Sequence, residues 1–232
     1  RDYPPPLRMI ALGLASVVRR RWTTVQTESS TMRRALHVAE KPSVAKSLAA
    51  TLSHGRCASR QGPSKYNRIF DFDADFQPPG GGAQRWQHAV TSVTGHLMQS
   101  EFAAPFNKWH ACAPRDLLRE DHVPVVWFVP DDKRELKRQL EQEARRADVV
   151  VLWLDCDREG EAIAFEVVDV CTAANRRLEF YRAKFSSLDA PAVARAWQTL
   201  GRPDRHKADA VRARAELDLR AGSAFTRVPT FR

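Results

Sequence analysis

The chain has 232 residues, 37 basic and 28 acidic side chains and a formal net charge of +9, a length that suits one or two domains. Hydrophobic residues make up 43% and charged residues 28% of the chain, which excludes wholesale disorder. The longest apolar stretch, Met9 to Val18, is too short to span a bilayer, so we expect no membrane segment.

The first predicted elements are a buried strand and a helix. Residues 35–39, apolar apart from His37, are typical of a short buried strand. Pro42 follows, a residue that the first turn of a helix tolerates, and apolar residues then recur at Val44, Leu48 and Leu52. This spacing of four predicts a helix from Pro42 to the region of Leu52.

The next stretch combines strands with loops. Aromatic and acidic residues alternate over 66–76, which predicts a strand or hairpin, and 86–93 is a second strand candidate. Between them, 78–82 holds prolines and glycines and predicts a loop. It is not a phosphate-binding loop, because no Gly-Lys-Ser or Gly-Lys-Thr follows. We expect residues 100–132, rich in Pro and Trp, to be irregular.

The second half of the chain alternates helices with strands. Amphipathic spacing predicts a helix over 133–147, and the continuous apolar run 149–154 is typical of a strand covered on both faces. A helix over 161–171 and a strand over 178–185 follow. This alternation predicts an α/β fold with a parallel sheet flanked by helices.

Charge divides the chain into three segments. Residues 1–34 carry +5, residues 35–190 carry −1 and residues 191–232 carry +5. The first segment is Arg-rich and poor in acids, as in a mitochondrial transit peptide; translated upstream sequence before an effective start at Met32 is the alternative. We expect the second segment to be the α/β domain and the third, helical and basic, to begin another domain. Because residue 1 is Arg, we expect the chain to be cut from something longer.

Carboxylates gather directly after the buried run 149–154. Asp155, Asp157 and Glu159 stand two residues apart, and open α/β sheets bind ligands beyond the carboxyl ends of their strands. Three carboxylates require a cation, and all-oxygen ligands favour Mg²⁺ over Zn²⁺. Glu40 ends the first strand, and it faces this group if the two strands are neighbours.

Two other interpretations of the acidic segment stay open. The segment can be a solvated acidic turn without function. It also approaches the calcium loop of an EF-hand, because Gly160 and Glu166 fall at loop positions 6 and 12 counted from Asp155. A strand precedes the segment where an EF-hand has a helix, and Ala162 takes the place of a bulky aliphatic, which both count against a calcium loop.

Five ordered sequence blocks resemble one enzyme family. The blocks are Glu40-Lys41-Pro42-Ser43, Thr91-Ser92-Val93-Thr94-Gly95-His96-Leu97, Asp155-Cys156-Asp157-Arg158-Glu159-Gly160-Glu161, Arg182-Ala183-Lys184-Phe185-Ser186-Ser187 and Glu216-Leu217-Asp218-Leu219-Arg220. Together they resemble type IA DNA topoisomerases, specifically eukaryotic topoisomerase III, and more the beta than the alpha form. The resemblance runs from about Ala35 to Arg227. It implies a TOPRIM domain, with a Rossmann-like parallel sheet, over residues 35–190, and the start of a mostly helical domain over 191–232.

The resemblance implies a reaction and a role for each acidic residue. Such enzymes relax negatively supercoiled DNA without ATP, by breaking one strand with a tyrosine, passing another strand through and rejoining the first. By position, Asp155, Asp157 and Glu159 would hold Mg²⁺. Glu40 would act as acid or base and share the metal, and Lys41 would stabilise charge on the scissile phosphate.

The family's attacking tyrosine lies in a later domain and matches no residue of this chain. The tyrosines present, Tyr3, Tyr66 and Tyr181, stand outside that context, and strand packing is the expected role of the last two. Ala215 also departs from the family, whose members commonly carry Gln there. We therefore expect a fragment, or a gene model that went wrong at an exon edge, that cannot nick DNA by itself.

Basic residues provide the candidate nucleic-acid contacts. Arg182 and Lys184 leave a predicted strand near the acidic cluster, and we expect them to bind phosphates. We expect the same of Arg212, Arg214 and Arg220, on a basic helical stretch. The alternative for each helical arginine is a solvated position or an ion pair with a neighbouring acid.

The resemblance also implies the setting in which the chain works. We expect an isomerase of the nucleus, or of the mitochondrion if residues 1–34 act as a transit peptide. Its cofactor would be Mg²⁺ and its partners single-stranded DNA, with RNA as a further candidate, and a protein of the topoisomerase III complex; nothing in the sequence indicates an oligomer. The alternatives are a non-catalytic nucleic-acid or Mg²⁺-binding module and a TOPRIM nuclease or primase. His96 is expected to stabilise a turn, with a nucleic-acid contact as the alternative.

Overall fold

The computed structural model describes residues 32–231, which lie within one compact unit, Met32–Arg232. The strands are β1 (Arg34–Ala39), β2 (Ala58–Arg60), β3 (Ile69–Phe76), β4 (Gln84–Ser92), β5 (Gln99–Phe102), β6 (Val125–Phe128), β7 (Val149–Trp153) and β8 (Glu179–Arg182). The α-helices are α1 (Pro42–Leu52), α2 (Arg134–Ala144), α3 (Arg158–Ala174), α4 (Ala190–Gln198) and α5 (Arg205–Arg227). Short 3-10 helices are η1 (Pro114–Leu118), η2 (Asp131–Lys133) and η3 (Val228–Phe231).

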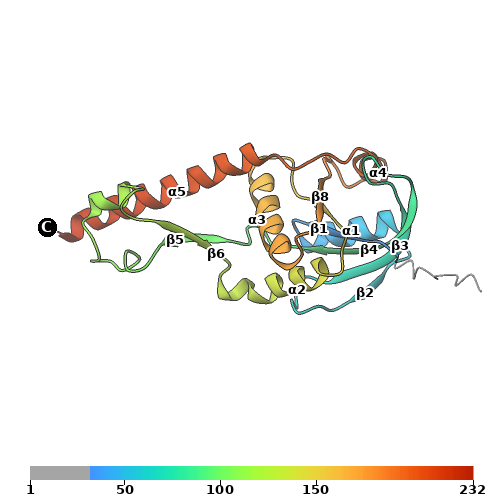
Figure 1. The fold of residues 1–232 in the computed structure, drawn as a ribbon, viewed down its shortest axis with the longest axis horizontal. Helices are drawn as coiled ribbons and strands as arrows, with labels where there is room; N and C mark the ends of the chain where they lie inside the picture. Colours follow the sequence, from blue (N-terminus) through green and yellow to red (C-terminus); the bar gives the residue numbers. More distant parts are fainter. Residues whose placement is uncertain (1–31, 232) are drawn as a thin grey trace, which may run out of the picture. The chain divides into compact units, whose positions relative to one another are not determined.

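Six of the strands form a mixed, mostly parallel sheet. Its order is β2-β3-β4-β1-β7-β8, and β5 and β6 form a separate antiparallel hairpin. Strand β1 is parallel to both of its neighbours, β4 and β7, and β8 is parallel to β7. Only the β2–β3–β4 side is antiparallel. This sheet with helices around it confirms the predicted α/β fold (Figure 1).

Strand β7 is buried on both faces, as its unbroken apolar sequence predicted. In β7, Val150 and Leu152 pack into the cluster that contains residues of α2 and α3. Val151 and Trp153, on the other face, pack into the cluster that contains residues of α1 and α4. Because neighbouring residues of a strand point to opposite faces, covering both sides leaves no position of β7 for a polar residue.

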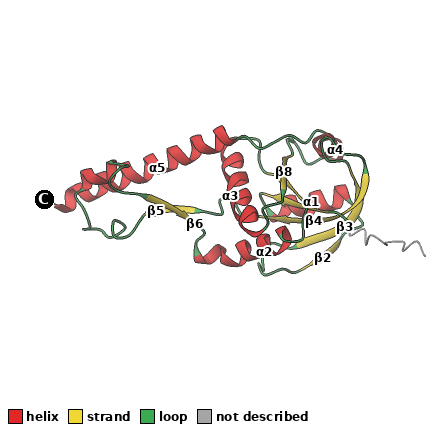
Figure 2. Cartoon of the chain, in the orientation of Figure 1, coloured by secondary structure: helices red, strands yellow, loops and turns green. Residues whose placement is uncertain are grey.

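The helices cover the two apolar faces of the sheet. Helices α2 and α3 cover one face and α1 and α4 the other (Figure 2). Helix α5 packs against α3, against η1 and against the β5 strand, so it runs along the hairpin away from the sheet. The third core cluster lies there, around the buried side chains of Phe102, Leu117, Val123 and Ala224.

Several boundaries differ from the predicted ones. The region 100–132, expected to be irregular, contains the β5–β6 hairpin and η1, and α3 begins three residues before the predicted 161. Strand β1 begins at Arg34. The predicted extension 1–34 otherwise lies outside the described residues, apart from Met32 and Arg33. Within residues 32–231, no helix has both the length and the apolar character needed to cross a membrane.

Candidate functional site

The carboxyl ends of β1 and β7 meet at one edge of the sheet and bring Glu40, Lys41 and Asp155 together. The two strands are direct neighbours, as the prediction for Glu40 required. Glu40 Oε2 accepts a hydrogen bond from the Asp155 backbone N–H at 3.2 Å. Lys41 Nζ lies 3.4 Å from Glu40 Oε1 and 3.6 Å from Asp155 Oδ2. Glu40, and then Asp155, raise the pKa of Lys41, so this edge keeps a cation between its carboxylates.

Asp157 caps helix α3. Its Oδ1 accepts a hydrogen bond from the Gly160 backbone N–H at 2.7 Å, the usual role of Asp at a helix start. Gly160 is required by space, because a Cβ there would lie 2.0 Å from the backbone oxygen of Asp155. The turn that carries Asp155 and Asp157 is therefore folded tightly against the start of α3.

Glu159 is turned toward a histidine. Its Oε2 lies 3.1 Å from His96 Nε2, and His96 Nδ1 lies 2.9 Å from Glu166 Oε1. Glu166 is buried, and its Oε2 also accepts hydrogen bonds from the backbone N–H groups of Leu97 and Met98. Hydrogen bonding to Glu166, with a smaller effect of Glu159, raises the pKa of His96. His96 thus links the segment after β4 to α3.

Glu166 also removes the EF-hand interpretation. Its carboxylate is occupied by His96 and two backbone donors, and the acidic segment follows strand β7 where an EF-hand has a helix. A calcium loop needs that glutamate as a bidentate ligand at its twelfth position.

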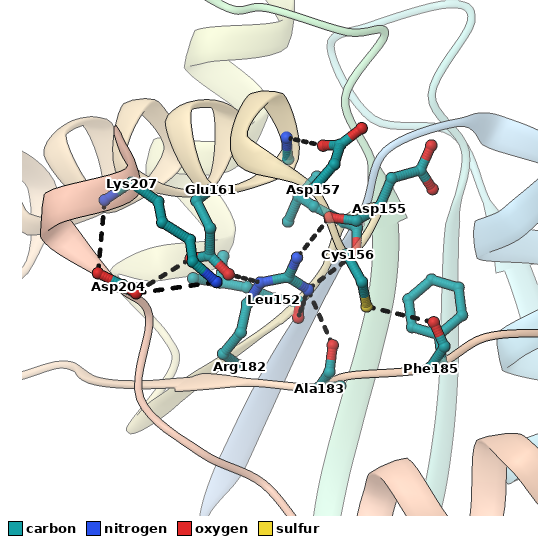
Figure 3. A network of polar contacts seen from close by, with 12 residues as sticks. Leu152, Asp155, Cys156, Asp157, Glu161, Arg182, Ala183, Phe185, Asp204 and Lys207 are labelled. Atoms are coloured by element: carbon teal, nitrogen blue, oxygen red, sulfur yellow. Dashed lines mark hydrogen bonds and ion pairs between the residues drawn. The ribbon is translucent and has the colours of Figure 1, made fainter. Parts of the chain in front are cut away.

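Arg182 is wholly buried and does not reach a phosphate, which corrects its predicted role. Its Nε donates to Glu161 Oε1 at 3.1 Å, and its Nη2 donates to the backbone oxygen of Asp155 at 2.7 Å. Its Nη1 donates to the backbone oxygens of Leu152, Leu154 and Ala183. Figure 3 shows this guanidinium beneath the turn, with the carboxylates of Asp155 and Asp157 directed away from it. Arg182 supports the turn from inside.

Arg220 is also structural. It is buried, donates to Glu216 Oε1 at 2.6 Å and donates through Nη1 to the backbone oxygens of Leu117 and Val123. The alternative interpretation, an ion pair within the helix, therefore holds for this residue, and its predicted phosphate contact is wrong. Lys184, in contrast, is exposed after β8.

Arg212 and Arg214 border a cavity of about 550 Å³ beside Glu159 and His96. Arg212 forms an ion pair with Asp169 at 3.1 Å, and its guanidinium lies 5.2 Å from the centre of the Trp127 ring. Arg214 is more exposed and lies 3.7 Å from Asp218. An aromatic ring and two guanidinium groups in one cavity suit a nucleotide, because bases stack on aromatic rings and phosphates bind Arg.

The donor set at the edge fits a hard cation in its chemistry. Glu40, Asp155 and Asp157 offer only oxygen, and Asp155 is 51% exposed at the end of the sheet. Among residues 32–231, no three His, Cys, Asp or Glu side chains are already arranged around one point as metal ligands. Lys41 occupies Glu40 and Asp155, and His96 occupies Glu159. A cation would therefore have to compete with Lys41 for the first two carboxylates.

Sequence reasoning missed the partners that hold the site. Glu161 was assigned no role, yet it bonds Arg182 and accepts from the backbone N–H of Asp204 at 3.1 Å, ahead of α5. Its signal was a carboxylate on the helix face that also carries the apolar residues Ala164, Phe165 and Val168. Glu166 carried the same signal, because it interrupts the apolar residues of α3.

Comparison with known proteins identifies the family. The family model described as Toprim domain matches residues 35–188. DNA topoisomerase 3-alpha of Arabidopsis thaliana is 51% identical over 195 residues, which are 84% of this chain and 20% of that protein. DNA topoisomerase 3 of Dictyostelium discoideum is 46% identical over 198 residues, 85% of this chain and 23% of that protein. The chain thus spans about a fifth of the length of the curated relatives that it matches.

The identities correct the expected likeness to the beta form. DNA topoisomerase 3-beta of Arabidopsis thaliana is 38% identical over 199 residues, 85% of this chain and 22% of that protein, against 51% for the alpha form of the same plant. Both forms are nonetheless matched over a similar share of the chain, 84% and 85%. The chain belongs to the Toprim-domain family and, within it, to the type IA DNA topoisomerases.

Proposed function

We propose that this chain is the metal-binding part of a type IA topoisomerase that relaxes negatively supercoiled DNA by Mg²⁺-assisted strand breakage, passage and rejoining. The observation that carries the proposal is the edge formed by Glu40, Lys41 and Asp155 across neighbouring strands, with Asp157 beside it at the start of α3. Mg²⁺ bound by Glu40, Asp155 and Asp157 would supply charge stabilisation and orientation of the strand end. Glu159 completes the predicted ligand set and would first have to leave His96.

The edge residues have distinct parts in this proposal. Lys41 is an exposed cation and offsets the negative charge of a phosphate that lies at the edge. Glu40 is 13% exposed, and it accepts the proton of a ribose hydroxyl during rejoining and returns it during breakage. Arg182 and Glu161 do neither; they keep the Asp155 backbone in place.

The cavity beside α5 receives the nucleic-acid strand. Trp127 and Met98 offer apolar surface to a base, and Arg212 and Arg214 offer charge to its phosphates. The cavity also contains Glu159, so a strand held there reaches the carboxylate edge. Lys184, exposed after β8, is a further phosphate contact in this proposal.

The attacking tyrosine comes from outside this chain in the proposal. Tyr181 is buried and donates to Glu179 at the amino end of β8, the far end from Lys184. Tyr66 is exposed, with the Lys65 ammonium 4.9 Å from the centre of its ring. Tyr3 lies outside the described residues.

A chimeric enzyme tests the proposal. The segment of Arabidopsis DNA topoisomerase 3-alpha that matches this chain is replaced by residues 34–227 of the chain, and relaxation of negatively supercoiled plasmid is measured with Mg²⁺. We expect the chimera to relax the plasmid and the 232-residue chain alone to leave it unchanged. Lys41→Gln in the chimera should lower the rate by roughly a hundredfold, because it removes the cation beside the phosphate.

Lys46→Gln is the matched control, since Lys46 is an exposed lysine on helix α1, which begins directly after Lys41. A folded chimera without activity, or equal losses from the two lysine variants, would contradict the proposal. Relaxation by the 232-residue chain alone would contradict the assignment of the tyrosine to another part of the enzyme.

The setting of this activity is part of the proposal. The substrate is single-stranded DNA within a supercoiled molecule, with RNA as a second substrate, and a protein of the topoisomerase III complex is a partner. We propose a nuclear location, or a mitochondrial one if residues 1–34 act as a transit peptide.

A further inference from the structure

Four arginines converge at the edge of the sheet opposite to the carboxylates. Helices α2 and α3 run back along the parallel strands, so both end where β7 and β8 begin. Arg145 and Arg146 follow the end of α2, and Arg176 and Arg177 follow the end of α3. All four side chains are exposed, and together they border one cavity of about 560 Å³. These residues are called the four-arginine patch below.

The two arginine pairs are held beside each other by a specific contact. The Asn175 side chain donates to the backbone oxygens of Ala144 and Ala147, both at 3.0 Å, and so joins the end of α3 to the end of α2. Asn175 Oδ1 also accepts from the backbone N–H of Arg177 at 3.0 Å. The spacing of the patch is therefore set by the folded backbone, and it does not depend on chance side-chain positions.

Most of the charge of the patch is not neutralised by the fold. Only Arg145 has an acidic partner, Glu141 at 3.9 Å, and the other three arginines form no ion pair with another side chain of residues 32–229. Asp148 is the one acid that borders the same cavity among residues 32–229, and its Oδ2 accepts a hydrogen bond from the Arg34 backbone N–H. One arginine after a helix is common because it offsets the helix dipole, but four from two helices exceed that need.

We infer that the four-arginine patch binds the phosphates of a nucleic-acid segment separate from the one at the carboxylate edge. Each guanidinium group can donate two parallel N–H hydrogen bonds to a phosphate. Adjacent arginines can therefore bind neighbouring phosphates of one strand. Within residues 32–229, the apolar side chains that border the cavity are those of Ala147 and Ala174, and this part of the chain places no aromatic or long aliphatic anchor of a protein interface there. The inference rests on membership of a DNA-acting family and is independent of the metal chemistry proposed for the other edge.

The test measures binding of a fluorescein-labelled oligothymidylate to the 232-residue chain by anisotropy, over a range of salt and with EDTA present. The patch variant is R146Q/R176Q/R177Q. Its matched control is R56Q/R115Q/R134Q, which removes the same charge from three exposed arginines elsewhere. We expect the patch variant to bind about tenfold more weakly at low salt and its slope of log affinity on log salt to fall by about 2, because three phosphate contacts are lost. The control should change affinity less than about twofold.

Equal losses in the two variants would overturn the inference, because they would show general attraction by net charge. So would an unchanged affinity in the patch variant. Binding of poly-glutamate, lost in the patch variant while oligonucleotide binding persists, would assign the patch to an acidic protein instead. Hydrogen exchange provides the second measurement: the oligonucleotide should protect backbone amides of residues 145–148 and 174–178. Protection at the carboxylate edge alone would also overturn the inference.

Discussion

Each carboxylate at the active edge already has a protein partner. Asp155 and Glu40 share Lys41, and Asp157 accepts from the Gly160 backbone. A cation at this edge therefore exchanges one set of contacts for another and does not enter an empty set of ligands. In the proposed function, the affinity of this edge for Mg²⁺ would depend on how readily Lys41 moves away from Glu40 and Asp155.

We expect Asp155→Asn/Asp157→Asn to weaken Mg²⁺ binding by at least about tenfold, because two anionic ligands become neutral. Asparagine caps helices as well as aspartate does, so the start of α3 should remain intact. The matched control is Asp131→Asn/Asp132→Asn, which removes two exposed acids from η2. Calorimetric titration of the 232-residue chain measures both. Equal affinities in the two variants would show that the cation binds elsewhere.

Two buried histidines form a directed hydrogen-bond chain through the sheet. Trp153 Nε1 donates to His37 Nδ1 at 3.1 Å, so the proton of His37 is on Nε2, 3.0 Å from His88 Nδ1. His88 then donates through Nε2 to the backbone oxygen of Ala74 at 3.3 Å. Both rings are neutral, since burial lowers the pKa of His37 well below its usual value and that of His88 to about 4.

Stability should therefore fall as the pH drops below the usual histidine pKa of about 6.5. The unfolded chain takes up protons there and the folded chain does not, so each histidine contributes up to about 1.4 kcal/mol of lost stability per pH unit until its own pKa is reached. Urea unfolding from neutral to mildly acid pH measures this loss. Nitrogen-15 spectra should show both imidazoles with protonated Nε2 and bare Nδ1 at about pH 5.5. A charged imidazolium in the folded protein at that pH would contradict the account.

At the scale of elements, the start of α3 is the most constrained junction. The backbone of the turn after β7 lies so close to Gly160 that no side chain fits at this position. The Asp157 carboxylate accepts a hydrogen bond from the Gly160 N–H. The positions of Asp155 and Asp157 are therefore tied to the start of α3.

Gly160→Ala should destabilise the protein by about 1–3 kcal/mol, because the new Cβ forces the backbone of Asp155 to shift, and it should also weaken Mg²⁺ binding. Gly222→Ala in α5 is the control. Nothing lies within 4 Å of a Cβ at Gly222, so alanine should stabilise that helix by about 0.5–1 kcal/mol. Denaturant unfolding and metal titration measure the pair. Equal effects of the two substitutions would mean that the turn has more room than its geometry indicates.

Elements with strong local patterns were predicted well. The apolar run of β7, the alternation of β3 and the spacing of α1 each specify their type without tertiary information. The β5–β6 hairpin was missed because its strands are four residues each and are separated by residues 103–124, so neither shows a clear period. The start of α3 was placed too late because its first turn is charged.

At the scale of the whole molecule, the sequence predicted which carboxylates meet at the site, but not the buried side chains that hold the surrounding backbone in place. Glu40 and Asp155 could be placed together because parallel strands end at the same side. The burial of Arg182 and Arg220 could not be predicted, because it depends on carbonyl groups that only the folded chain brings together. Positive charge alone made these two arginines resemble Lys184, which is exposed.

The bond between Glu40 and the Asp155 backbone joins residues 115 positions apart. Pairing of β1 with β4 closes a shorter loop, and the entropy cost of closure grows with loop length. During synthesis, Glu40 and Lys41 emerge from the ribosome before Asp155. A cation held by both Glu40 and Asp155, as proposed above, would therefore have to bind after β7 has paired with β1.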